Sequence, residues 1–202
     1  MLTGLAVFGL YPPGDVAIAR AVQSMRLPGL EVASDVLYRA GLSPLFQVIA
    51  LGMGVLLFWR RHRLASAFVL LAVAGRGMGG LLKEIVERPR PSPLVVDVSD
   101  QASGFSFPSG HVLGTVLLLG FVFYLAQETI PSRPIRLVVQ ASSVIVIALM
   151  GLQRVYAGAH WPTDVLAAYL WGGVILFALV QLYRFCGRCH WRRLVARIAG
   201  RS

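Results

Sequence analysis

The stretch VLAAYLWGGVILFALVQLY, from Val165 to Tyr183, contains no charged side chain. An α-helix needs about 20 consecutive, mainly apolar residues to cross the hydrocarbon core of a bilayer. The stretch meets that requirement, so it is predicted to be a transmembrane helix. The rest of the chain is therefore interpreted as a protein surrounded by lipid.

Further apolar stretches extend the prediction to the whole chain. The chain is 56% hydrophobic and 14% charged over 202 residues, which is far from the composition of a soluble domain. The stretch Val112–Ala126 reaches spanning length only if its helix begins at Ser109. The sequence therefore predicts an all-α integral membrane protein, a bundle of five transmembrane helices. The four additional spans are Leu42–Trp59, Leu64–Leu82, Val112–Ala126 and Ile135–Leu152.

The N-terminal residues do not fit this spanning pattern. Leu2–Leu10 is apolar but too short to cross a bilayer, and two prolines soon follow it. Asp15–Met25 and Leu30–Tyr38 mix apolar and charged residues, as amphipathic helices in the membrane interface do. We expect an interfacial segment over residues 1–40, a transmembrane domain over 41–184 and a basic tail over 185–202.

Charge placement predicts the orientation of the bundle. With five spans, the loops at 59–64 and 127–135 and the C-terminus lie on one side of the membrane. Eleven of the 19 Lys and Arg residues lie on that side, against one acidic residue, Glu128. The positive-inside rule makes this the cytoplasmic side. We expect a multipass protein of the bacterial cytoplasmic membrane with a cytoplasmic C-terminus.

The basic charge does not indicate a nucleic-acid partner. The net charge is +10, but the cations form no stripe with interleaved aromatic residues on a soluble face. The tail from Arg184 to Arg201 is better explained as a topology signal beside anionic headgroups. Cys186–His190 matches the haem-attachment pattern, but it follows the last span on the predicted cytoplasmic face. A zinc or redox role would need further ligands, so we expect no cofactor.

Three polar clusters lie on the opposite side of the membrane. The first contains Lys83, Arg88 and Arg90, and two prolines among them stop the helix. Lys supplies a point charge and Arg a planar fork, a mixture that suits a tetrahedral anion. The cluster is predicted to form a cationic rim above the end of the span.

The second cluster is Pro108-Ser109-Gly110-His111. Ser109 is placed to cap the next helix, and Gly110 leaves room for an anion at the free backbone N–H groups of the helix start. His111 in the first turn would point its ring at the same anion and act as a general acid. The cluster therefore predicts an anion site at a helix N-terminus.

The third cluster runs from Arg154 through His160 to Asp164. Pro162 suits the first position of a helix, which places His160 just before that helix. Asp164 lies four residues after His160 and can hold one of its ring nitrogens, so that the other nitrogen is free to attack phosphorus. This arrangement indicates a nucleophilic histidine with an orienting carboxylate.

Each cluster taken alone also has a plainer explanation. Basic residues often anchor spans, a serine often caps a helix, and a His and an Asp can form a surface pair. A metal site is a further alternative for the two histidines and Asp164, but the surrounding cations oppose a divalent ion. We expect no bound metal. The convergence of all three clusters on one membrane face favours the phosphate site.

The three clusters together resemble the signature of the type 2 phosphatidic acid phosphatases, which is Lys-x6-Arg-Pro, Pro-Ser-Gly-His and Ser-Arg-x5-His-x3-Asp. The resemblance covers Lys83 to Asp164. It implies that residues 41–184 form a phosphatase domain. The implied catalytic residues are His160 as nucleophile, Asp164 as its orienting partner and His111 as the acid. The implied phosphate ligands are Lys83, Arg90, Ser109, Gly110 and Arg154.

The chain departs from this family pattern in two respects. Gln153 stands where the family has Ser, so a longer amide replaces a hydroxyl beside the phosphate. The family core has six helices, and here the first span is reduced to Leu2–Leu10. Three further residues are candidates for the pocket: Gln153, Arg88 and the intramembrane Arg76. For Arg76, pairing with Glu84 or with backbone carbonyls is an equally good explanation.

The resemblance implies a metal-independent lipid phosphatase that acts through a phosphohistidine at the outer membrane surface. Undecaprenyl diphosphate is the expected substrate. Phosphatidylglycerophosphate, phosphatidic acid and lipid A phosphates remain alternatives, as does a catalytically silent lipid-phosphate-binding protein. The outward loop Ser92–Phe107 is expected to recognise the lipid headgroup. Within it, Asp97 and Asp100 could repel a second anionic group or bind a sugar hydroxyl. The sequence does not predict the oligomeric state.

Overall fold

The computed structural model describes residues 12, 14–25, 30–41, 43–100 and 103–199. All regular secondary structure within these ranges is helical. The helices are α2 (Asp15–Gln23), α3 (Leu30–Gly41), α4 (Ser43–Trp59), α5 (Arg63–Gly75), α6 (Gly77–Val86), α7 (Gly110–Thr129), α8 (Arg133–Tyr156) and α9 (Pro162–Ala199).

Four helical segments are long and apolar enough to cross a membrane, which confirms the membrane bundle predicted from the sequence. A fifth predicted span forms α4, whose apolar part, Leu45–Trp59, is shorter. The span predicted to start near Ser109 begins at Gly110, as expected. The four spanning segments are Arg63–Val86, Gly110–Thr129, Arg133–Tyr156 and Pro162–Arg188.

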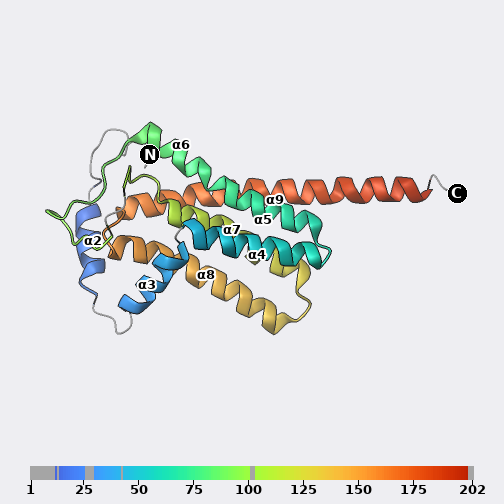
Figure 1. The fold of residues 1–202 in the computed structure, drawn as a ribbon, viewed down its shortest axis with the longest axis horizontal. Coiled ribbons are helices and arrows are strands. Elements are labelled where there is room, and N and C mark those ends of the chain that lie inside the picture. The colour runs from blue at the N-terminus through green and yellow to red at the C-terminus, as the bar shows by residue number, and fades with distance from the viewer. Residues whose placement is uncertain (1–11, 13, 26–29, 42, 101–102, 200–202) are drawn as a thin grey trace.

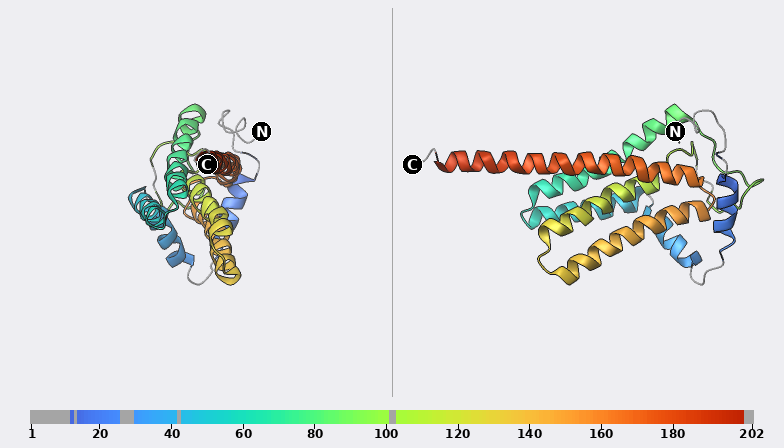
Figure 2. Two further views of the ribbon diagram at one scale, coloured as in Figure 1. Left: turned by 90° about the vertical axis from the view of Figure 1, so that its right-hand side faces the viewer. Right: turned by 180° about the vertical axis from the view of Figure 1, so that it is seen from behind.

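Helix α7 forms the centre of the bundle, between α5, α8 and α9 (Figures 1 and 2). Its side chains Leu113, Leu117 and Phe121 are completely buried. Small residues allow the neighbouring helices to approach it closely. A Cβ atom at Gly172 of α9 would lie 2.8 Å from Val116, so a larger residue there would push α9 away from α7.

The span predicted over Leu64–Leu82 is interrupted at Arg76, where α5 ends and α6 begins. Glycines flank this residue, and Gly-rich positions are common sites of helix kinks. The Gly75-x3-Gly79 step packs closely against α7, because Cβ atoms there would lie 3.1 Å from Leu117 and 2.9 Å from Leu113. Beyond Arg76, α6 leans away from the other helices (Figure 1).

The predicted N-terminal amphipathic segments form α2 and α3, which lie at one end of the bundle (Figure 1). The loop between α6 and α7 and the turn between α8 and α9 come to the same end (Figure 2). All three sequence clusters therefore meet there. At the other end, the predicted tail continues α9 as a helix beyond the bundle. The predicted remnant of a first span, Leu2–Leu10, lies outside the described residues.

Candidate active site

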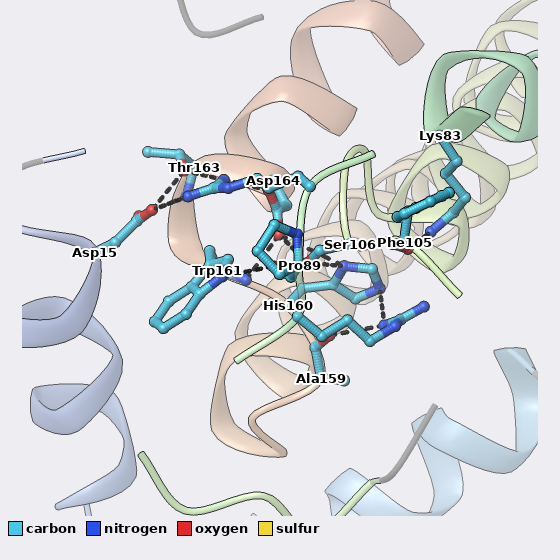
Figure 3. A network of polar contacts seen from close by, with 12 residues as sticks. Asp15, Lys83, Pro89, Phe105, Ser106, Ala159, His160, Trp161, Thr163 and Asp164 are labelled. Atoms are coloured by element: carbon cyan, nitrogen blue, oxygen red, sulfur yellow. Dashed lines mark hydrogen bonds and ion pairs between the residues drawn. The ribbon is translucent and has the colours of Figure 1, made fainter. Parts of the chain in front are cut away.

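His160 lies in the tight turn between α8 and α9 and is 3% exposed (Figure 3). Its backbone N–H and that of Ala159 both donate to the Arg154 carbonyl. Gly158 makes the turn with a φ of +65°, and a Cβ there would lie 2.0 Å from the Asp97 carbonyl oxygen. The turn therefore requires glycine at this position.

The two ring nitrogens of His160 have different surroundings. Nδ1 lies 3.5 Å from Ser106 Oγ and 3.8 Å from Asp164 Oδ2. Nε2 lies on the other side of the ring, 3.3 Å from an Arg90 guanidinium nitrogen. The carboxylate is thus nearer to Nδ1, although the distance is too long for a direct hydrogen bond. Nε2 is the nitrogen available to a ligand beside Arg90.

Burial lowers the pKa of His160 to about 4, although the nearby Asp164 carboxylate opposes the shift. The ring is therefore neutral at pH 7, so one of its nitrogens carries no proton and keeps a lone pair. Burial also lowers the pKa of the Arg90 guanidinium from its usual range. A neutral imidazole beside a cation has the properties of a nucleophile facing an anionic substrate.

Asp164 is completely buried and is held by several donors. The Ser106 hydroxyl donates to its Oδ2, and the Trp161 backbone N–H donates to the same oxygen at 2.9 Å. The second contact caps the start of α9, which begins at Pro162 as predicted. Asp164 therefore combines two roles, because it fixes the helix start and places a negative charge beside His160.

Arg88 does not line the phosphate pocket, which corrects the prediction for this residue. Its side chain is 2% exposed and forms ion pairs with Asp164 and, at 2.7 Å, with Asp15 of α2. Asp15 in turn accepts hydrogen bonds from the backbone N–H and the hydroxyl of Thr163 (Figure 3). Two buried carboxylates pair with the Arg88 guanidinium, so its charge is compensated without substrate phosphate.

Lys83 and Arg90 form a cationic wall beside His160. The Lys83 ammonium donates to the Phe105 carbonyl (Figure 3). The Arg90 guanidinium donates to carbonyls of Gly104 at 2.9 Å, Ala159 at 2.8 Å and Ser103 at 3.1 Å. These contacts hold Lys83, in the last turn of α6, and Arg90, on the loop after α6, against carbonyls of that loop and of the turn before α9. The predicted cationic rim is therefore built by Lys83 and Arg90, without Arg88.

Arg154 is 1% exposed and is held from two sides. Its Nε donates to the Gln153 side chain at 2.6 Å, and one terminal nitrogen pairs with Asp100 at 2.9 Å. Gln153 also donates to Ser34 of α3 at 3.2 Å, so its side chain links Arg154 to α3. Asp100 was expected to read the substrate headgroup, but the structure pairs it with Arg154. Asp97 accepts from Gln23 through its backbone carbonyl.

The Pro-Ser-Gly-His cluster starts α7, with Ser109 at the N-cap position. The Ser109 hydroxyl makes no capping hydrogen bond, unlike a typical N-cap serine. His111 lies within electrostatic range of Arg90, Arg154 and His160. Tyr38 of α3 stacks against His111, and the Arg154 guanidinium lies 5.2 Å from the centre of the Tyr38 ring. Tyr38 therefore covers the site from the N-terminal side.

Three polar atoms at this site are buried and have no hydrogen-bond partner within the described part of the chain. They are Ser109 Oγ, His111 Nε2 and one terminal nitrogen of Arg154. Buried polar atoms in native proteins are nearly always paired, and exceptions often mark functional sites. Together with the backbone N–H groups at Gly110, these atoms can receive the oxygens of one tetrahedral anion.

Arg76 lies deeper in the bundle, at the break between α5 and α6. It lines a cavity of about 510 Å³ together with Lys83 and Gly110. Among the residues that the structure describes, neither Glu84 nor any other acidic side chain forms an ion pair with it. The alternative that Arg76 pairs with Glu84 is therefore not favoured, and Arg76 lines the cavity instead.

Sequence reasoning missed Asp15, Ser106 and Tyr38. Each belongs to a segment that the clusters do not include, and only packing brings these residues to the site. Ser106 comes two residues before Pro108, which is the one local hint that it belongs to the second cluster. Over the described ranges, no three His, Cys, Asp or Glu side chains lie together as a metal site requires. Independence from metal stays a prediction.

The sequence and the fold both match known proteins. The model of the PAP2 superfamily matches residues 49–188. The chain is 34% identical over 175 residues to phosphatidylglycerophosphatase B of Bacillus subtilis, covering 83% of this chain and 81% of that protein. It is 30% identical over 131 residues to an undecaprenyl-diphosphatase of Sulfolobus acidocaldarius, covering 63% of this chain and 59% of that protein.

One solved structure shows the same fold. It is the crystal structure of a transmembrane PAP2-type phosphatidylglycerolphosphate phosphatase from Bacillus subtilis. The TM-score is 0.76 at 24% sequence identity, and the match covers 89% of this chain and 91% of that one. The helical bundle described above is therefore an architecture already known for membrane proteins.

Proposed function

The chain belongs to the PAP2 superfamily, and from this premise we propose how this membrane lipid phosphatase works and on which lipid. His160 is the nucleophile, and the reaction passes through a phosphohistidine on the extracytoplasmic face of the membrane. Asp164 orients His160, and His111 is the general acid. The phosphate ligands are Lys83, Arg90, Ser109, Gly110 and Arg154. Undecaprenyl diphosphate is the first candidate substrate.

One observation carries this proposal: three unpaired buried polar atoms, on Ser109, His111 and Arg154, come from two of the sequence clusters. The nucleophile approaches from the same end of the bundle, with its Nε2 atom 3.3 Å from Arg90. A phosphate that binds Arg90 is thereby placed beside Nε2. Positioning of this kind supplies a large part of the catalysis of phosphoryl transfer.

In the first step, His160 Nε2 attacks phosphorus and the bond between phosphorus and the lipid oxygen breaks. His111 transfers a proton to the departing oxygen, so the lipid leaves as a neutral alcohol or as a lipid monophosphate. Positive charge develops on the His160 ring, and the buried Asp164 carboxylate stabilises it. The fixed cations on Arg90 and Arg154 hold the phosphoryl oxygens throughout.

In the second step, water attacks phosphorus and the phosphorus–nitrogen bond breaks. His111 now accepts the proton of the attacking water, because the same residue serves both half-reactions. Inorganic phosphate leaves and His160 returns to its neutral state. Both steps need the cations and histidines of this chain, and no step is assigned to a metal.

Phosphatidylglycerophosphate is the second candidate substrate. The chain is 34% identical to phosphatidylglycerophosphatase B of Bacillus subtilis over most of both sequences, which favours this lipid. The identity to an undecaprenyl-diphosphatase favours the first candidate. Both lipids end in a phosphate that the proposed ligands can hold. A panel with these two lipids, phosphatidic acid and lipid A therefore decides the preferred substrate.

The mechanism is tested by measuring phosphate release from lipid substrates by the purified protein in detergent. His160→Ala should abolish release, whereas His62→Ala should not, because His62 is exposed at the opposite end of the bundle. A chelator should leave the activity unchanged. Acid-labile, alkali-stable labelling of the protein by a ³²P-lipid should be lost with His160.

Three outcomes would contradict the proposal. Full activity in His160→Ala would exclude it as the nucleophile. Loss of activity on chelation would support metal-assisted hydrolysis instead. Tight lipid binding without phosphate release by the unmodified protein would support a silent lipid-phosphate-binding protein.

A further inference from the structure

Arg76 lies near the middle of the first long span, and the proposed mechanism leaves it without a role. Charged residues at this depth are costly and nearly always pair with another group or face a cavity. In the ranges covered by the structure, Arg76 has no acidic partner. Its guanidinium lies 5.2 Å from the centre of the Phe46 ring of α4, a contact that leaves its hydrogen-bond donors free.

The cavity beside Arg76 reaches the proposed phosphate site. Arg76 lines it together with Lys83 and Gly110, which are both proposed phosphate ligands. One wall of the cavity is formed by Gly77 and Gly80, where a Cβ atom would meet nothing within 4 Å. A lipid headgroup can therefore extend from Lys83 toward Arg76.

The position of the Arg76 side chain along α7 fits such a headgroup. Its Cδ atom would lie 3.1 Å from a Cβ atom at Gly114. Gly114 is three residues, or about one helical turn, from His111. The Arg76 side chain therefore contacts α7 about one turn deeper in the membrane than the proposed general acid.

We propose that Arg76 binds a second phosphate of the substrate, which lies between the cleaved phosphate and the lipid chain. This inference rests on the proposed function, because the terminal phosphate has to occupy the site near Lys83 and His160. The next phosphate then points into the cavity, where Arg76 offers a planar fork of donors. The preferred substrates are thus lipids whose leaving group is itself a phosphate ester.

This property separates the candidate substrates. Undecaprenyl diphosphate carries its second phosphate next to the cleaved one, and phosphatidylglycerophosphate carries it across a glycerol. Phosphatidic acid has no second phosphate, and its leaving group is neutral diacylglycerol. Arg76 therefore favours the first two lipids over the third.

Arg76→Gln tests the proposal with these three lipids. The kcat/KM for undecaprenyl diphosphate and phosphatidylglycerophosphate should fall about 10- to 100-fold, the usual effect of losing hydrogen bonds to a charged group. The kcat/KM for phosphatidic acid should change less than about threefold on the same grounds. Arg76→Lys should recover part of the loss. Arg63→Gln is the matched control, because Arg63 is on the same span and lies 5.6 Å from the Phe58 ring.

An equal loss on all three lipids, or no loss on any, would overturn the proposal. A loss on only one of the two diphosphorylated lipids would support it and identify that lipid as the source of the second phosphate. Lipid binding to the His160→Ala variant gives a test that does not depend on turnover. In the His160→Ala variant, adding Arg76→Gln should weaken binding of undecaprenyl diphosphate at least tenfold relative to binding of phosphatidic acid. An unchanged ratio of these two affinities would refute the subsite, whether or not the protein releases phosphate.

Discussion

At the scale of single residues, His160 combines burial with a nearby carboxylate. Burial lowers its pKa to about 4, below the usual value of a histidine, and Asp164 only partly opposes the shift. The neutral ring is available as a nucleophile at neutral pH. This burial lowers the free energy of unfolding at low pH, because the unfolded chain then binds a proton at this histidine that the folded protein does not bind.

The pH dependence of stability tests this burial. Between pH 6.5 and about 4 the unfolded histidine is protonated and the folded one is not, so stability falls as the pH falls through that window. His160 should account for about 2 kcal/mol of the loss between pH 7 and pH 5. Unfolding midpoints in detergent should fall less steeply in His160→Gln than in the unmodified protein. Exposed His62→Gln should keep the original slope, and equal slopes in all three proteins would show that His160 titrates normally.

At the scale of secondary-structure elements, α2 is joined to the proposed catalytic centre. Asp15 at its start is 1% exposed and shares the Arg88 guanidinium with Asp164. One cation is thereby divided between two carboxylates. The negative charge of Asp164 is therefore compensated less fully than it would be beside an undivided arginine, and in the proposed mechanism that charge stabilises the His160 ring during attack.

Asp15→Asn tests this link. The substitution keeps the size of the side chain but removes its charge, so Arg88 should neutralise Asp164 more completely. We expect kcat to fall about tenfold with KM nearly unchanged, because the lost stabilisation acts only in the transition state. Asp35→Asn on α3 is the control, since its ion pair with Arg39 is exposed and should contribute little. A change in KM alone would contradict the proposed role of Asp15.

At the scale of the whole molecule, the bundle separates a polar end from a basic end. The three clusters, α2 and α3 meet at one end, and the loop between α4 and α5 lies at the other (Figures 1 and 2). The positive-inside rule predicts that the basic end lies in the cytoplasm. The active site would then act on lipid headgroups of the outer leaflet.

Cysteine labelling tests this orientation. In a variant with both native cysteines replaced by Ala, Ser103→Cys in the active-site loop should react with a membrane-impermeant maleimide in spheroplasts. Arg61→Cys, in the loop after α4, should react only after permeabilisation. Both positions are exposed, so the difference reports the side of the membrane. The reverse pattern would place the active site in the cytoplasm.

The sequence by itself determined the membrane bundle and the identity of the three clusters. Spanning helices follow from the local run of apolar residues, as in Val165–Tyr183, and the start of α9 follows from Pro162. Only the tertiary structure decided which charges meet. Arg88 pairs with Asp164 and with Asp15, across separations of 76 and 73 residues, instead of facing phosphate. Such pairs depend on how distant segments pack together, and no local sequence pattern predicts which residues will meet.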